Sequence, residues 1–234
     1  MDKKRGIVSS LSLLSRELPG LHLLRRTGRP EIDSHCEIAL RVLRGDRFCA
    51  GYLDDVAAFK LETARLALRE WRSTDALDFA ALNAYPNVME FFTSVLSRVS
   101  SDALLETFRE GFAEQGFCPF AVEKLTTREF IGFVGLQPVA DGMPAADGVE
   151  IGWRPASAYW GQGYATEAAR AALQFGFGAC GLEEIVAFTS VPNIRSQAVM
   201  VRLGMHRDPA DDFDHPTIPE GHRLRRHVLY RITP

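Results

Sequence analysis

The sequence YWGQGYATEAAR, residues 159–170, joins an alternating apolar run to a long Ala-rich segment. The run before it, 148–153, has the alternation of a strand, and the segment after it has the composition of a helix as far as Gly178. Gly161 and Gly163 can adopt backbone angles that are closed to other residues. The first N–H groups of the helix, and the positive end of its dipole, would therefore face this turn and favour a phosphate or another anion.

The glycines alone leave two interpretations open, an anion-binding turn and an ordinary tight turn. The sequence contains no Gly-x-x-x-x-Gly-Lys-Ser/Thr and no Gly-x-Gly-x-x-Gly. Neither a P-loop nor a dinucleotide-binding fingerprint is therefore supported.

Outward from this turn, strand-like and helical patterns succeed one another and predict a mixed α/β sheet of about six to seven strands flanked by helices. Ser73–Asp75 and Ser100–Asp102 are expected to begin the first two helices. The strand–helix–strand unit around the turn is expected to be a parallel crossover. The expected strands are 65–71, 117–123, 129–138, 148–154, 184–191, 205–207 and 225–232, and the expected helices are 73–83, 100–115, 165–177 and 194–203.

The whole chain has 234 residues, of which 46% are hydrophobic and 24% charged, and its net charge is -3. These values are typical of a soluble globular protein and give no general attraction to nucleic acid. No apolar run is long enough to span a bilayer, and Arg16-Glu17 interrupts the only short apolar patch near the start. We therefore expect a cytoplasmic protein without a membrane partner.

The chain is expected to divide into an N-terminal extension, residues 1–60, and one domain, residues 61–234. The extension is dense in Arg and Lys and is broken at Gly28-Arg29-Pro30, so it is expected to be helical or loosely ordered. A weaker hypothesis makes it an arm that docks on RNA or the ribosome. The four cysteines form no Cys-x-x-Cys pair and are expected to be reduced packing residues: Cys36, Cys49, Cys118 and Cys180.

Several stretches together resemble the GNAT superfamily of N-acetyltransferases, and more closely its branch of ribosomal-protein N-terminal acetyltransferases. They are 61–69 (LETARLALR), 149–153 (VEIGW), 160–168 (WGQGYATEA), 193–196 (NIRS) and 203–205 (LGM). The resemblance implies the GNAT fold and transfer of an acetyl group from acetyl-CoA to an amine. One position departs from the family pattern Gln/Arg-x-x-Gly-x-Gly/Ala, because Trp160 replaces its Gln or Arg. A side-chain contact to the pyrophosphate is therefore expected to be missing.

The resemblance also implies a binding site for acetyl-CoA. The pyrophosphate would accept hydrogen bonds from the backbone N–H groups of Gln162, Gly163, Tyr164, Ala165 and Thr166. The hydroxyl of Thr166 could equally cap the helix. The pantetheine amides would pair with a strand edge at Ile151, Gly152 and Trp153, where one N–H would stabilise the oxyanion of the tetrahedral intermediate.

Three polar residues are candidates for the chemistry. Glu150 should point opposite to Ile151 and is the candidate general base, acting directly or through water, unless it is a solvated strand residue. By resemblance, Asn193 would bind the pantetheine arm and Ser196 would lie near the thiol as an acid or hydrogen-bond donor. The alternative for Ser196 is a local backbone bond in the first turn of its helix.

The acceptor is expected to be a protein N-terminus or a small amine, attacked without a covalent enzyme intermediate. Phe91 and Phe92 could form a wall of the acceptor site, or belong to the core. His215 and His222 could line the acceptor pocket, or cap a Pro-rich loop. The histidine spacing does not fit a zinc site, so no metal is expected. The alternative function is a non-catalytic acyl-CoA-binding sensor, and the protein is expected to be a monomer or homodimer.

Overall fold

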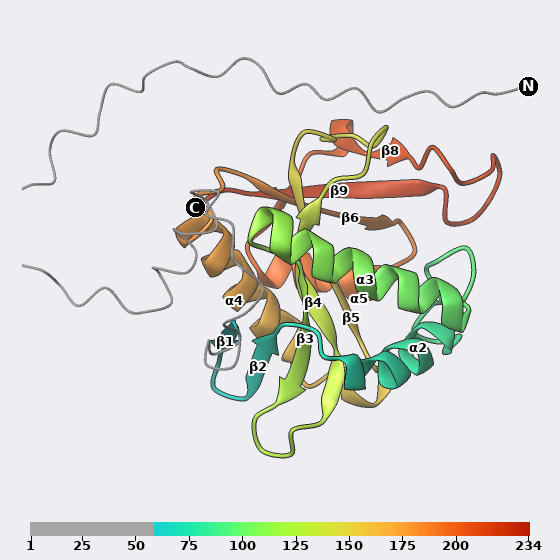
Figure 1. Ribbon diagram of the computed structural model, residues 1–234. Coiled ribbons are helices and arrows are strands. Elements are labelled where there is room, and N and C mark those ends of the chain that lie inside the picture. Colours follow the sequence, from blue (N-terminus) through green and yellow to red (C-terminus); the bar gives the residue numbers. More distant parts are fainter. Residues whose placement is uncertain (1–58) are drawn as a thin grey trace, which may run out of the picture. The chain divides into compact units, whose positions relative to one another are not determined.

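The strand, turn and helix expected around the glycines are present in the computed structural model, which describes residues 59–234 (Figure 1). β5 (Val149–Pro155) leads through a 3-10 turn, η2 (Ser157–Tyr159), into α4 (Tyr164–Gly178). Gly161 and Gly163 have φ values of 73° and 81°, in the left-handed region that favours glycine. The expectations for residues 1–58, including the RNA-docking arm, lie outside the described residues.

The sheet has nine strands in the order β1-β2-β3-β4-β5-β6-β9-β7, with β8 beside β9. β5 and β6 are parallel, as expected for the crossover through α4, and the other pairings within residues 59–234 are antiparallel. Besides β5, the strands are β1 (Lys60–Glu62), β2 (Leu66–Arg69), β3 (Pro119–Lys124), β4 (Phe130–Pro138), β6 (Ile185–Ser190), β7 (His206–Arg207), β8 (Phe213–Asp214) and β9 (Arg226–Ile232).

The sheet has more strands than the expected six to seven. The sequence did not predict β1 and β8, which are only three and two residues long. Strands this short show no alternation of their own, and it is pairing with β2 and β9 that defines them.

Helices cover both faces of the sheet, and in Figure 1 α3 crosses the foreground. On one face, α4 buries Ala168 and Ala172 against Leu136 and Ile151. A Cβ on Gly176 would lie 2.7 Å from Leu136 Cδ1, so this glycine lets α4 approach the sheet closely. On the other face, aromatic residues of the sheet meet α2 and α3 in a second cluster that contains Trp71, Phe79, Phe108 and Phe133. The remaining helices are η1 (Ser73–Asp75), α2 (Ala76–Ala84), α3 (Arg98–Gln115), α5 (Ile194–Arg202) and η3 (Pro209–Asp211).

Two helix starts differ from those expected. Ser73–Asp75 form the 3-10 turn η1 before α2, and α2 has no side-chain cap. α3 begins at Arg98 rather than at Ser100–Asp102, because Ser97 accepts a hydrogen bond from Ser100 N at 3.1 Å and caps the helix.

A buried ion cluster, formed by Arg69, Asp75 and Glu123, joins β2, η1 and β3. Arg69 donates two hydrogen bonds to Asp75, at 2.7 and 2.9 Å, and a third to Glu123 at 2.7 Å. All three residues are at most 5% exposed. Asp75 also accepts a hydrogen bond from Arg72 N at 2.7 Å, so its carboxylate is fully occupied here rather than capping α2.

Candidate active site

The sheet is interrupted next to the glycine turn. β5 and β6 share a single residue pair, Glu150 with Val186, and no further pairing joins these two strands. The ladder between β5 and β6 therefore ends after this one pair. Backbone groups of residues 151–153 that point toward β6 are therefore available to an extended amide chain, as at any free strand edge.

The N-terminus of α4 is the second part of the site. Gly163 is the N-cap, and no side chain caps the helix, so the expected alternative of Thr166 as a cap is not found. The first N–H groups of α4 therefore retain the capacity to bind an anion.

Arg65 lies beside this turn, a neighbour that the sequence did not indicate. Its Nη1 donates to Gln162 O at 3.1 Å, and its guanidinium lies 4.4 Å from the centroid of the Tyr164 ring. Glu167 on α4 holds it in place through an ion pair of 2.6 Å. An Arg–Glu ion pair thus lies beside the N–H groups at the start of α4.

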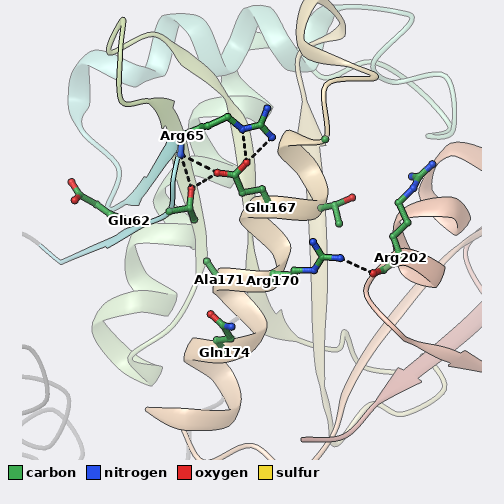
Figure 2. A pocket seen from close by; sticks show the side chains of 10 residues that line it. Glu62, Arg65, Glu167, Arg170, Ala171, Gln174 and Arg202 are labelled. Atoms are coloured by element: carbon green, nitrogen blue, oxygen red, sulfur yellow. Dashed lines mark hydrogen bonds and ion pairs between the residues drawn. The ribbon is translucent and has the colours of Figure 1, made fainter.

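An open groove runs from the turn along the outer face of α4 (Figure 2). Figure 2 shows the Arg65–Glu167 pair at one side of the groove and Arg170, which donates to Arg202 O at 3.0 Å, at the other. The groove is lined by arginines and by two glutamates, Glu62 and Glu167, and Glu167 is paired with Arg65. The lining residues are Glu62, Thr63, Arg65, Gly163, Thr166, Glu167, Arg170, Ala171, Gln174 and Arg202.

Asn193 and Ser196 meet at the start of α5. Asn193 is the N-cap, and its Oδ1 accepts from Ser196 N at 3.2 Å. Its Nδ2 lies within hydrogen-bond distance of Thr189 Oγ1 and Ser196 Oγ, at 2.9 and 3.0 Å. Ser196 Oγ therefore accepts from the Asn193 side chain rather than bonding its own backbone, and its hydroxyl proton stays available to a ligand.

Glu150 points to the face of the sheet opposite Ile151, which is buried under α4. Burial raises the pKa of Glu150, and a hydrogen bond from Gln137 Nε2 opposes that rise by stabilising the carboxylate. Such a carboxylate is a better proton acceptor than one in water. These surroundings argue against a merely solvated strand residue.

Trp160, which departs from the family pattern, is anchored by its Nε1, which donates to Pro155 O at 2.9 Å. The guanidinium of Arg195, on α5, lies 4.4 Å from the Trp160 ring centroid and pairs with Glu90 at 2.7 Å. Arg195 therefore brings a cation to this position from another element, whereas the family pattern places a Gln or an Arg in the turn itself.

Phe91 and Phe92 lie in the segment between α2 and α3. Phe92 is 46% exposed, and Phe91 lies 5.8 Å from the Arg195 guanidinium. Neither ring belongs to a buried hydrophobic cluster. The surroundings therefore fit a wall of the site better than they fit the core.

His215 and His222 each accept a backbone N–H two residues further on through Nδ1, from Thr217 at 3.3 Å and Leu224 at 3.2 Å. These bonds support the role of capping the loop. A role for either histidine in binding the acceptor stays a prediction.

Two cysteines fall in the described part, and both are free thiols, Cys118 and Cys180. Burial raises the pKa of both, that of Cys180 to about 11, as expected for packing residues. Residues 59–234 contain no group of three or more His, Cys, Asp or Glu side chains that could hold a metal ion. Nor does this part of the chain include a helix long and apolar enough to cross a membrane.

The left-handed turn residue gives a direct test of the anion site. We expect Gly163→Ala to raise the dissociation constant of acetyl-CoA about tenfold, because a Cβ at positive φ adds roughly 1–2 kcal/mol of strain where the N–H groups must be aligned. Calorimetric titration measures the change. Gly178→Ala, on the same helix with open space around its Cβ, is the matched control. Equal affinities for the two variants would contradict this role of the turn.

Comparisons with known proteins agree on one family. The family model described as "Acetyltransferase (GNAT) domain" matches residues 65–206. The chain is 27% identical over 150 residues to the uncharacterized N-acetyltransferase YoaA of Bacillus subtilis, a match that covers 63% of this chain and 83% of that protein.

Solved structures of low sequence identity share the fold. The ribosomal-protein-S5-alanine acetyltransferase of Vibrio fischeri superimposes with a TM-score of 0.60 at 18% identity, covering 75% of this chain and 96% of that one. RimJ of Mycobacterium smegmatis, solved in complex with CoA-disulfide, gives a TM-score of 0.57 at 24% identity, covering 72% of this chain and 81% of that one.

Proposed function

The chain belongs to the GNAT family of acetyltransferases, and from this membership we propose that it transfers the acetyl group of acetyl-CoA to a primary amine by direct attack. The family uses acetyl-CoA as its co-substrate. The observation that supports the proposal most is the interruption between β5 and β6 beside the glycine turn. A free strand edge next to a helix N-terminus offers partners for the amides and for the pyrophosphate of the same molecule.

In this proposal, the pyrophosphate accepts hydrogen bonds from the N–H groups of residues 162–166. Arg65, which is paired with Glu167, holds this turn through its hydrogen bond to Gln162 O. The pantetheine amides pair with the edge of β5 at residues 151–153, and Asn193 and Ser196 approach the thiol end from α5. RimJ of Mycobacterium smegmatis, which shares the fold, was solved with CoA-disulfide, and this supports binding of a CoA by analogy.

The reaction then needs two proton transfers. The neutral amine attacks the thioester carbonyl carbon, and a backbone N–H of β5 stabilises the oxyanion that forms. The amine proton passes to Glu150, directly or through a water molecule. The C–S bond breaks, and the CoA sulfur takes a proton from solvent while Ser196 donates a hydrogen bond to the thiolate. The products are the acetylated amine and CoA.

The acceptor is a protein N-terminus or a small amine. An α-amine, with a reference pKa of about 7.7–8.0, is neutral more often at pH 7 than a lysine side chain at about 10.4, so it needs less help from a base. Likeness to the ribosomal-protein acetyltransferase of Vibrio fischeri favours a protein N-terminus by analogy of fold.

Calorimetric titration of the full-length protein with acetyl-CoA tests the proposal, with desulfo-CoA and NAD as comparison ligands. We expect selective binding in the micromolar range, followed by acetylation in a screen of amines. A folded sample that does not bind acetyl-CoA would overturn the proposal. Tight binding without acetylation of any amine, peptide N-termini included, would indicate a non-catalytic sensor instead.

A further inference from the structure

Arg154, near the end of β5, is held in a fixed orientation on the face of the sheet away from α4. Its guanidinium carbon lies 4.3 Å from the centroid of the Phe92 ring and 5.0 Å from that of Phe133. Its Nη1 donates to Asn83 Oδ1 on α2, and Asn83 is fully buried. Two rings and a helix side chain thus fix the plane of this arginine.

Arg154 has no counter-ion within residues 59–234. No carboxylate of the described chain lies within ion-pair distance of it, whereas each of the other arginines within the described strands has such a partner: Arg69, Arg207, Arg226 and Arg231. Its Nε is buried without a hydrogen-bond partner. Burial lowers the pKa of Arg154 to about 10. A buried N–H donor without an acceptor is costly, and the Nε–H of Arg154 is therefore a group that a ligand could complete.

The free donors of Arg154 have a defined geometry. A guanidinium has five N–H donors, and one on Nη1 bonds Asn83. Among the four that remain, the Nε–H, which has no partner, and one Nη2–H point in parallel from one edge of the guanidinium. A carboxylate accepts such a pair with both of its oxygens. A single amide oxygen satisfies only one of the two donors.

Ser190 provides a second, independent observation at the same level of the sheet. Because Glu150 pairs with Val186, the position level with Arg154 on β6 is Ser190, four residues further along each strand. Ser190 is 1% exposed, and its Oγ is the other buried side-chain atom of residues 59–234 that lacks a hydrogen-bond partner. Both orphaned groups therefore lie beyond the point where β5 and β6 stop pairing.

The face of β5 on which Arg154 lies places it nearer the expected acceptor than the expected acetyl-CoA. The groove with its arginines lies along α4, whereas Arg154 shares the opposite face of β5 with Glu150. Four residues of strand separate the Cα atoms of Glu150 and Arg154 by roughly 13 Å, and both side chains extend from that backbone. This spacing leaves room for a molecule whose amine meets Glu150 while a second group reaches Arg154.

We propose that the acceptor carries a carboxylate as well as its amine, and that Arg154 binds this carboxylate with both oxygens. The inference rests on the proposed acetyltransferase function and narrows its acceptors to amino acids and peptides with a nearby acidic or C-terminal carboxylate.

Pairs of acceptors that differ only in a carboxylate test the inference. Serine and serinamide, alanylalanine and its C-terminal amide, and glycylglutamate and glycylglutamine place that group at increasing distances from the amine. We expect the carboxylate member of at least one pair to have a kcat/KM about 10- to 100-fold above that of its amide. Arg154→Gln should abolish this preference, and Arg154→Lys should keep part of it.

Two controls separate this inference from the proposed function. Arg98→Gln removes an exposed arginine that pairs with Asp102 on α3, and it should leave the preference intact. The affinity for acetyl-CoA should be the same in the wild type and in all three variants. Acetyl-CoA binding without a carboxylate preference in any pair, or a preference that survives Arg154→Gln, would overturn the inference alone. Failure of the wild type to bind acetyl-CoA would overturn the proposed function itself.

Discussion

Glu150→Gln is expected to lower kcat about 10²- to 10⁴-fold, the usual contribution of a positioned general base. Glutamine keeps the size of the side chain and can still bond Gln137, but it cannot accept the amine proton. Acetyl-CoA affinity should not change, since the proposed contacts to the co-substrate come from backbone groups of β5 and from α4 and α5, and none comes from the Glu150 side chain. Steady-state kinetics with saturating acetyl-CoA, together with calorimetry, measures both quantities.

The dependence of kcat/KM on pH identifies the general base independently of how far kcat falls in Glu150→Gln. Burial raises the pKa of Glu150, so the acidic limb of kcat/KM should lie above the ordinary glutamate value of about 4.3. Activity should fall as the pH drops through that raised pKa, because only the carboxylate accepts a proton. The limb should disappear in Glu150→Gln, while the alkaline rise caused by deprotonation of the amine persists.

Glu106→Gln is the matched control, because Glu106 pairs with Arg109 on the exposed face of α3. It should leave kcat and the pH profile unchanged. Full activity of Glu150→Gln, with an unaltered acidic limb, would exclude Glu150 as the base. Ser196→Ala should have a much smaller effect, because a serine hydroxyl positions the leaving thiolate without being a strong acid.

Asp75→Asn is expected to lower the free energy of unfolding by about 3 kcal/mol, because it leaves Arg69 with a buried charge that only Glu123 balances. Urea denaturation followed by circular dichroism measures the loss. Asp102→Asn breaks an exposed pair with Arg98 of the same residue types, and it should cost about 0.5 kcal/mol or less. Similar losses in the two variants would show that the buried ion cluster adds nothing beyond a surface pair.

The loss in Asp75→Asn should also depend on pH. Burial opposes ionisation of Asp75, but its hydrogen bonds with Arg69 and Arg72 prevail and lower its pKa below the ordinary value. A carboxyl with a lowered pKa in the folded state contributes its full stability above the unfolded pKa of about 3.9. The difference between wild type and Asp75→Asn should therefore be constant near neutrality and shrink as the pH falls below about 4.

The parts of the fold that follow from local sequence agree with the structure. The alternation in 148–153 and the left-handed glycines Gly161 and Gly163 predicted β5, the turn and α4, because each pattern depends on neighbours along the chain. The start of α3 was wrong by a few residues, since Ser97 and Ser100 are equally good caps by type. Only the packed structure selects between them.

The candidate site was predictable only where a motif marks it. Glu150, Asn193 and Ser196 stand in recognisable stretches, whereas Arg65 and Arg154 look like ordinary strand arginines in the sequence. What distinguishes these two arginines is their surroundings. Arg65 meets Gln162 and Arg154 meets Asn83 across long separations in the chain, and no local pattern encodes such contacts.

The single residue pair between β5 and β6 has a mechanical consequence. It divides the sheet into two half-sheets, β1–β5 and β6–β9, whose only ladder pair within the described residues is Glu150 with Val186. Apart from this pair, the two half-sheets are connected by side-chain packing under α4 and by the covalent chain. A ligand that pairs with the facing edges of β5 and β6 would connect the two half-sheets. Binding of acetyl-CoA would then reduce the relative motion of the two half-sheets, and release of CoA would allow that motion again.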